Sequence, residues 1–158
     1  RWSIMRSSSI ADPAELETLT GRLMRLGPDA DRKWGTLTAN EMLCHLADAT
    51  DSVLGHRRTP DYKVNPRRRP VLKWLLLRTS FPWPHGVQTR AGIDPRKEGT
   101  RPSDFGKDRA RVISGLRELA TRGEDLSPSH GIMGQMTVEE WRIWAWRHTD
   151  YHLRQFGR

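Results

Sequence analysis

The chain has 158 residues, of which 35% are hydrophobic and 29% are charged. This length and balance predict one soluble globular domain over residues 1–158 and exclude a largely disordered chain. No apolar run in the sequence approaches the roughly 20 residues that a membrane-spanning helix needs. The single cysteine, Cys44, excludes an internal disulfide framework and favours a reducing compartment, so we expect a cytoplasmic protein.

The net charge of +8 is concentrated in one segment. Residues 57–78 hold eight basic side chains and a single acid, Asp61. Such a basic patch can bind an anionic polymer, an anionic membrane surface or an anionic substrate. A solvated basic connection is the simpler interpretation, because charge blocks are commonly loops. We expect no nucleic-acid or membrane partner, since no recognition motif of aromatic and basic residues accompanies the patch.

Capping signals and apolar spacing predict four long helices, at about residues 13–26, 38–55, 104–122 and 138–156. Asp12 followed by Pro13 is an N-cap with proline at the first helical position, and Glu15 is the predicted capping-box glutamate. Thr38 and Thr137 each open a capping box, with a glutamate three residues on. Ser103 is the predicted cap of the third long helix.

A segment of nearly fifty residues, 57–102, separates the second long helix from the third. It is rich in Pro, Gly and Arg, and Pro70 can begin a short helix over residues 71–78. So long a crossover frees the third long helix from packing antiparallel beside the second. The predicted fold is therefore all-α, a four-helix bundle with a long crossover between its second and third helices.

Two histidines, His148 and His152, lie four residues apart on the last predicted helix, so both rings project from one face. Trp141 and Trp144 share that face, which indicates that it points into the bundle. The stripe through His45 on the second predicted helix is half polar. If these two stripes face each other, three imidazoles converge. Three nitrogen ligands leave open coordination positions, as catalytic metal sites do.

Each of these histidines alone has a simpler explanation, because a hydrogen-bonded core histidine is more common than a metal ligand. The pair also departs from the zincin motif, since position 149 is Thr149 where that motif has a glutamate base. Asp48 lies on the half-polar stripe. Gln155 lies three residues after His152, which is about one helical turn. We interpret both as neighbours that orient the ligands or transfer protons.

Four short motifs carry a resemblance: KWG at 33–35, LCHL at 43–46, HGIMG at 130–134 and HTDYHLRQFG at 148–157. With this pattern the chain, from about residue 33 to its end, resembles the DinB-like superfamily of bacterial four-helix bundles. It is most similar to a subgroup of uncharacterised function. The resemblance implies that His45, His148 and His152 bind a divalent metal ion and that the protein forms a homodimer.

The leading hypothesis is a metal-dependent enzyme that acts on a small molecule. Zinc or nickel best suits three nitrogen ligands, and such an ion activates a bound water or thiolate. Asp48, Tyr151 and Gln155 are the candidate catalytic residues, for proton transfer or substrate orientation. The superfamily includes enzymes that use the low-molecular-weight thiols bacillithiol or mycothiol, so the resemblance implies a thiol-dependent transferase. A hydrolase would use the same site equally well.

Two other functions stay open on the sequence. The main alternative is a non-catalytic bundle that binds a metal or a ligand in the service of a partner. The second makes the basic patch at 57–78 the functional surface, which would bind an anionic polymer or a membrane surface with a strong dependence on salt.

Overall fold

The computed structural model describes residues 7–59 and 65–158, and this part of the chain is mostly helical. The α-helices in it are α1 (Pro13–Arg25), α2 (Ala39–Leu54), α3 (Arg69–Arg78), α4 (Phe105–Thr121) and α5 (Val138–Gln155). The shorter elements are the 3-10 turns η1 (Pro66–Arg68) and η2 (Ala91–Ile93) and the antiparallel strands β1 (Ser129–His130) and β2 (Gly134–Gln135).

The four long helices begin and end within one residue of their predicted bounds. Two of the three predicted capping boxes form, whereas Glu15 accepts the N–H of Ser9 at 2.6 Å and the N–H of Asp12 is donated to the Ser9 carbonyl. The Thr38 hydroxyl accepts a hydrogen bond from the Glu41 N–H at 3.2 Å, while the Glu41 carboxylate accepts from the Thr38 N–H at 2.9 Å. Thr137 and Glu140 repeat this exchange at the start of α5. The helices that carry the candidate site therefore start where local backbone chemistry directs them to start.

The predicted cap of α4 is wrong by one residue. Asp104 is the N-cap, and its carboxylate accepts a hydrogen bond of 2.8 Å from the N–H of Lys107. Ser103 lies outside the helix and donates its own N–H to Asp108 at 2.9 Å. Serine and aspartate are equally good caps, and a carboxylate also interacts favourably with the positive end of the helix dipole.

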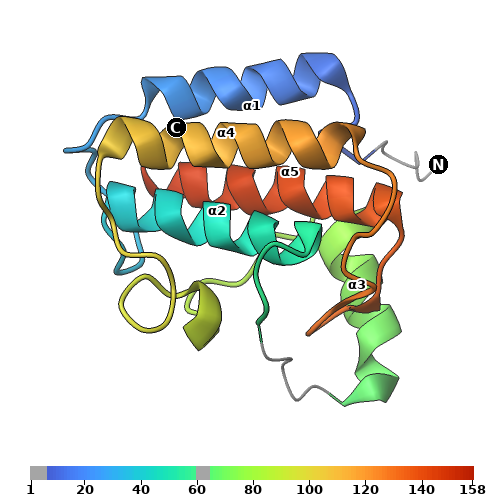
Figure 1. Ribbon diagram of the computed structural model, residues 1–158. Helices are drawn as coiled ribbons and strands as arrows, with labels where there is room; N and C mark the ends of the chain where they lie inside the picture. Colours follow the sequence, from blue (N-terminus) through green and yellow to red (C-terminus); the bar gives the residue numbers. More distant parts are fainter. Residues whose placement is uncertain (1–6, 60–64) are drawn as a thin grey trace.

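The four long helices lie side by side, and α3 lies apart from them, against α5 (Figure 1). The colour gradient along each ribbon shows that α2 and α4 run in one direction and that α1 and α5 run in the other. Neighbouring α2 and α4 are thus parallel, so the chain must return to the starting end of α2 between them. The segment that holds α3 and η2 makes this return, and α3 begins two residues before its predicted start.

Apolar side chains from all four long helices form the core, including Leu19, Leu23, Leu43, Leu46, Leu116, Leu119, Ile143 and Leu153. Full burial of a side chain of this size contributes roughly 1.5–3 kcal/mol. α2 and α4 pack closely where Gly115 faces Thr50, since a Cβ at Gly115 would lie 3.2 Å from Thr50 Cγ2. Tight packing of this kind fixes the middle of α2, the part of that helix that carries His45.

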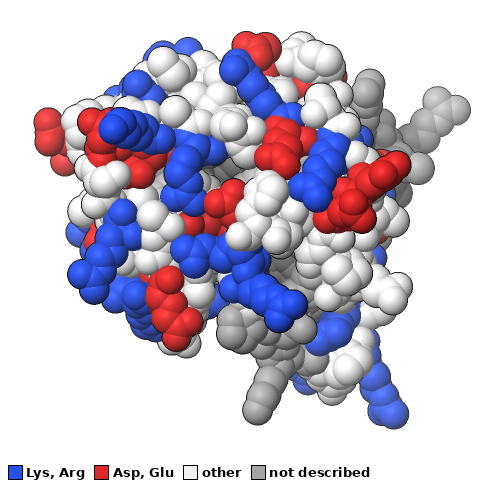
Figure 2. All heavy atoms as spheres, viewed as in Figure 1, with Lys and Arg blue, Asp and Glu red and all other residues white. Residues whose placement is uncertain are grey.

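The basic patch at residues 57–78 is partly neutralised. Asp61 and Lys63 lie outside the described residues, but three of the described cations form ion pairs: Arg57 with Asp48, Lys73 with Glu140 and Arg78 with Glu139. On the face drawn in Figure 2, basic and acidic side chains are interleaved over the upper part, where the long helices lie. In the described part of the chain, no helix combines the length and the apolar character that crossing a membrane requires.

Candidate metal centre

Three histidines from two antiparallel helices meet in the interior of the molecule. His45 projects from the middle of α2, and His148 and His152 project from successive turns of α5. The ring centroids lie 5.1 Å apart for His45 and His148, 4.7 Å for His45 and His152, and 4.8 Å for His148 and His152. The predicted convergence of the two helical faces is therefore what the structure shows.

The three rings present ligand nitrogens at a separation that suits one ion. One potential ligand atom from each histidine lies within 4.8 Å of the other two, and Nε2 of His45 is 3.2 Å from Nε2 of His148. Two nitrogens bonded at about 2.0–2.1 Å to a tetrahedral zinc ion lie roughly 3.3–3.4 Å from each other. The residues present therefore fit a divalent ion held by three imidazoles.

In His45 and His152, a hydrogen bond at Nδ1 determines which ring nitrogen is free to bind a metal ion. Nδ1 of His45 lies 2.9 Å from the carbonyl oxygen of Ile93 in η2, which can only accept, so Nδ1 carries the proton. Nδ1 of His152 donates in the same way to Oε1 of Gln155 at 2.7 Å. In the neutral form of each ring, Nε2 then holds the unshared electron pair, and Nε2 of His45 lies 3.2 Å from Nε2 of His148. Orienting partners of this kind accompany metal-bound histidine in most sites.

Burial keeps all three imidazoles uncharged. It lowers the pKa of His152 to about 3, with a smaller effect from the charge that His45 would carry. The pKa of His45 is lowered by burial as well. Burial also holds the pKa of His148 well below its ordinary value, and the neighbouring His152 and His45 lower it further. Neutral imidazole is the state that binds a metal, so the site is ready for an ion at neutral pH.

Gln155 occupies the neighbouring position that the sequence analysis assigns to it. Besides its bond to His152, its backbone carbonyl accepts a hydrogen bond from the N–H of Lys33. Gly35 passes so close that a Cβ there would lie 2.8 Å from Nε2 of Gln155, and Gly35 has a φ of 85°. The Lys33–Gly35 loop thus fixes the amide that orients His152.

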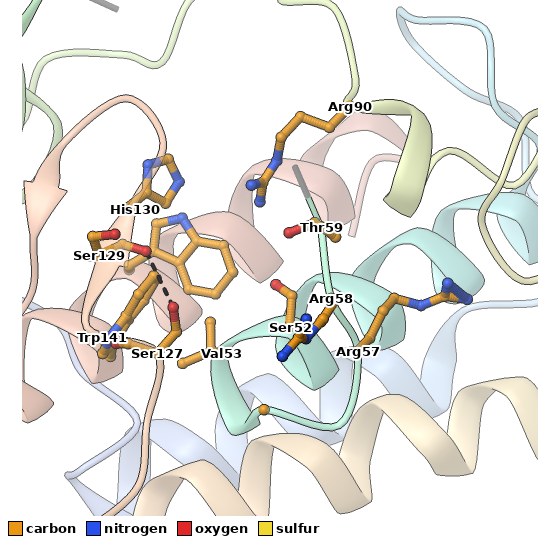
Figure 3. A pocket seen from close by; sticks show the side chains of 12 residues that line it. Ser52, Val53, Arg57, Arg58, Thr59, Arg90, Ser127, Ser129, His130 and Trp141 are labelled. Atoms are coloured by element: carbon orange, nitrogen blue, oxygen red, sulfur yellow. Dashed lines mark hydrogen bonds between the residues drawn. The ribbon is translucent and has the colours of Figure 1, made fainter. Parts of the chain in front are cut away.

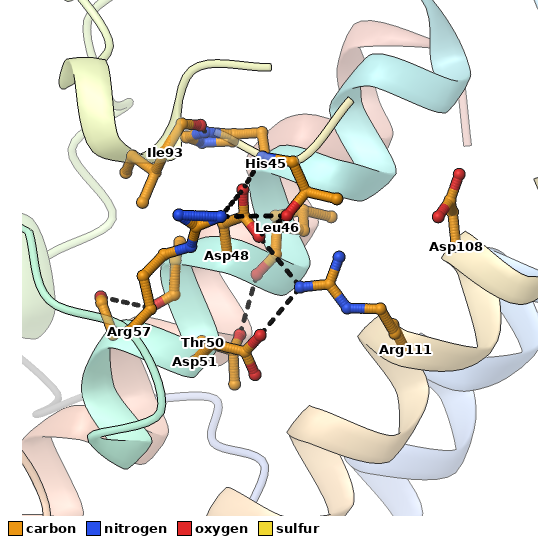
Figure 4. Close-up of polar contacts among 12 residues, drawn as sticks. His45, Leu46, Asp48, Thr50, Asp51, Arg57, Ile93, Asp108 and Arg111 are labelled. Carbon is orange, nitrogen blue, oxygen red and sulfur yellow. Dashed lines mark hydrogen bonds and ion pairs between the residues drawn. The ribbon is translucent and has the colours of Figure 1, made fainter. Parts of the chain in front are cut away.

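Asp48 lies one turn from His45, and Figure 4 shows its carboxylate joined to Arg57 and Arg111 by ion pairs. Its two oxygens accept hydrogen bonds from the N–H and the hydroxyl of Thr100, at 2.6 and 2.7 Å. Arg111 of α4 lies 2.9 Å from the same carboxylate and Arg57 lies 3.4 Å from it. This fully buried group therefore joins α2, α4 and the end of the crossover, and its part in proton transfer stays a prediction.

Tyr151 lies beside the three histidines, at the edge of an aromatic wall. Its ring centroid is 5.1 Å from that of His152, and its hydroxyl donates to the carbonyl of Pro84 at 3.3 Å. The ring centroid of Trp83 lies 5.9 Å from that of Tyr151 and 6.2 Å from that of His148. Trp83 and Tyr151 also line a pocket of about 400 Å³. The aromatic wall thus adjoins the candidate metal centre from the side of the crossover.

Sequence reasoning missed the contributions of the crossover and the hairpin. Trp83 and Arg90 come from the segment between α3 and η2, which has no periodic pattern from which a partner could be predicted. His130 belongs to a motif that the sequence analysis singles out, yet its place beside Trp144 depends on the turn between β1 and β2. Only the tertiary arrangement brings these residues to the histidines.

Comparisons of the chain with models of protein families, with curated proteins and with solved structures find no match. Any inference of function therefore depends on the geometry of His45, His148 and His152.

Proposed function

We propose that this protein is a metal-dependent enzyme with a DinB-like four-helix bundle, in which His45, His148 and His152 hold one divalent ion. The observation that carries the proposal is the convergence of three neutral imidazoles, with two Nε2 atoms 3.2 Å apart. All three donors are ring nitrogens on buried or partly buried side chains, which distinguishes the cluster from a chance group of exposed acidic residues. A structural zinc site has four protein ligands, whereas three leave a position open for catalysis.

Zinc or nickel suits this all-nitrogen donor set, and such an ion would supply Lewis acidity and open positions for a water or a thiolate. The surrounding residues have separable tasks. The Ile93 carbonyl and the Gln155 amide fix the orientation of two rings, and Trp144 stacks on His148 at a centroid distance of 4.8 Å. We assign Tyr151 to substrate orientation, because its ring borders the site on the open aromatic side.

The DinB-like assignment rests on the motifs of the sequence, and the mostly helical fold with four long helices side by side supports it. It extends the proposal to a transferase that uses a low-molecular-weight thiol, with a hydrolase as the other reaction that this site allows. A homodimeric, cytoplasmic protein with a small-molecule substrate is part of the same proposal.

A second candidate function is that of a non-catalytic bundle that binds a metal ion, and the burial of the histidines supports it. His45 and His152 are buried, with 5% and 8% of their surfaces exposed, and neither of the two described pockets is lined by a histidine of the triad. A bundle that holds a metal without turning over a substrate would show the same burial. The two candidates share the metal centre and differ in whether bound metal exchanges its open ligand with solutes.

Metal content tests the shared claim, and ligand exchange separates the candidates. Protein purified without an affinity tag or chelator should contain about one zinc or nickel ion per chain. His148→Ala should lose it, whereas His85→Ala, which changes an exposed histidine outside the triad, should keep it. Cobalt-substituted protein should then change its visible spectrum on addition of a small thiol. An unchanged spectrum would favour the non-catalytic bundle, and absence of metal after reconstitution would refute both.

A further inference from the structure

A second pocket, of about 340 Å³, shares no lining residue with the pocket beside Trp83 and Tyr151 (Figure 3). It is formed by the end of α2 and the residues that follow, by the segment before η2, by β1 and by the first half of α5. The residues that give it its chemistry are Arg57, Arg58, Arg90, His130, Trp141 and Trp144. None of the described residues that line it is acidic.

Three guanidinium groups line the described part of the pocket. Arg57 is partly compensated by Asp48, which lies 3.4 Å away behind it and is shared with Arg111. Arg58 adds a guanidinium from the same loop, and Figure 3 shows Arg90 reaching into the pocket from the opposite side. Guanidinium groups are planar, permanently charged donors that match the geometry of carboxylate and phosphate oxygens.

His130 supplies a neutral donor to the same space. Its Nδ1 accepts hydrogen bonds from the backbone N–H groups of Ile132 and Met133, at 3.0 and 3.4 Å. An imidazole nitrogen that accepts two bonds carries no proton, so the proton of the neutral ring is on Nε2. The turn between β1 and β2 thereby fixes His130 as an N–H donor at the pocket wall.

The pocket adjoins the candidate metal centre through one side chain. Trp144 lines the pocket, and its ring is stacked on that of His148 with an interplanar angle of 17°. A molecule in the pocket would therefore contact Trp144, the side chain that lies between the pocket and His148.

We propose that this pocket binds the anionic end of the substrate, a carboxylate or phosphate group on a small organic molecule whose apolar part packs against Trp144 and Trp141. The assignment to the substrate rests on the proposed metal-dependent function. Arg90, Arg58 and the N–H of His130 are the specificity-determining donors, and the two indole rings exclude water from the apolar part. A neutral substrate of the same shape would offer these donors no charge to bind and would bind more weakly.

The test uses three probes of one shape and different charge, with the full chain in both metal-free and zinc-treated form. Benzoate and phenyl phosphate represent the two anionic groups, and benzyl alcohol is the neutral control. Binding is followed by tryptophan fluorescence and by the indole N–H resonances, since two indoles line the pocket. We expect at least one anion to bind about 10-fold more tightly than benzyl alcohol, and the tighter of the two identifies the group.

Variants locate the binding. Arg90→Gln should weaken anion binding by about 10-fold, and Arg58→Gln should also weaken it. Arg117→Gln removes the same charge from an exposed position on α4, where Arg117 lies 3.6 Å from Glu17, and should change binding by less than about 2-fold. Equal binding of the anions and benzyl alcohol, or an unchanged affinity in Arg90→Gln, would overturn the proposal.

The zinc-treated samples test the metal centre and the anion-binding pocket separately. Anion binding by protein that takes up no zinc would retain the anion pocket and refute the metal centre. Zinc uptake without anion binding would retain the metal centre and refute the pocket as the site of an anionic substrate.

Discussion

Oε1 of Gln155 accepts a hydrogen bond of 2.7 Å from Nδ1 of His152, and this bond leaves Nε2 as the nitrogen of the neutral imidazole that can bind a metal. The side chain lies three residues beyond its partner on α5, so the same helix supplies a proposed ligand and its orienting group. The orientation of this ligand therefore depends on one amide and on the contacts that hold that amide in place.

Removal of the Gln155 amide should loosen the metal without unfolding the protein. Gln155→Leu keeps the approximate size of the side chain but cannot accept from Nδ1 of His152. We expect zinc affinity to fall by about 10- to 100-fold, the usual effect of losing a partner of a ligating histidine. Competition with a chromophoric chelator measures the affinity. Gln155→Glu, which keeps an acceptor, should lose less, and equal losses in the two variants would contradict the orienting role.

A methyl group at Gly35 should disturb the same amide from the other side. In Gly35→Ala the new Cβ would lie 2.8 Å from Nε2 of Gln155, at a φ of 85°. Gly86→Ala is the matched control, because Gly86 has a φ of 78° with nothing within 4 Å of the added Cβ. The control should lose about 1 kcal/mol of unfolding free energy through backbone strain. Gly35→Ala should lose more in urea denaturation and also bind zinc more weakly, and equivalence of the two variants would refute the contact.

The Asp48 carboxylate should matter for stability. Asp48→Asn removes the charge that Arg111 and Arg57 face while leaving a group of similar shape. We expect a loss of roughly 3 kcal/mol or more, as for other ion pairs broken at a buried partner. Asp51→Asn removes a more exposed carboxylate that also pairs with Arg111, at 2.8 Å, and should cost less than about 1 kcal/mol. Similar losses in the two variants would argue against the network around Asp48.

The free energy of unfolding should depend on pH in part through the protonation of His130. Burial, with a contribution from Arg90, lowers its pKa from 6.5 to about 3. The unfolded chain therefore takes up a proton below about pH 6.5 that the folded chain does not accept until about pH 3. This contribution to stability is fully present above pH 6.5 and is lost as the pH falls through that window.

Urea denaturation of metal-free protein between about pH 6 and pH 4 measures this effect. The free energy of unfolding of His130→Asn should fall less steeply with decreasing pH than that of the wild-type protein, by at most about 1.4 kcal/mol per pH unit. Parallel slopes would show that His130 titrates normally in the folded state.

Local periodicity predicts the helices and the pairing of His148 with His152, whereas the place of His45 beside them follows from the half-polar stripe on its helix and from the family resemblance. The four-residue spacing of His148 and His152 already places their rings on one face, and the capping boxes at Thr38 and Thr137 define where the two helices begin. The donors around the cluster were not predictable in this way. Arg90 reaches the site from a crossover without periodic pattern, and the Ile93 carbonyl depends on the position of a 3-10 turn.

The N-cap of α4 illustrates a smaller limit. Ser103 and Asp104 are adjacent, and either side chain can cap a helix, so propensity alone does not choose between them. The choice follows from Asp108, which accepts the N–H of Ser103 and holds that residue outside the helix.

X-ray absorption at the edge of the bound metal tests the central claim most directly, because it reports the ligands of the ion in the intact protein. We expect three imidazole nitrogens at about 2.0–2.1 Å for zinc, with any further ligand an oxygen from solvent. In His148→Ala the signal should disappear with the metal. A spectrum with sulfur ligands, or one that is unchanged in His148→Ala, would contradict the site formed by His45, His148 and His152.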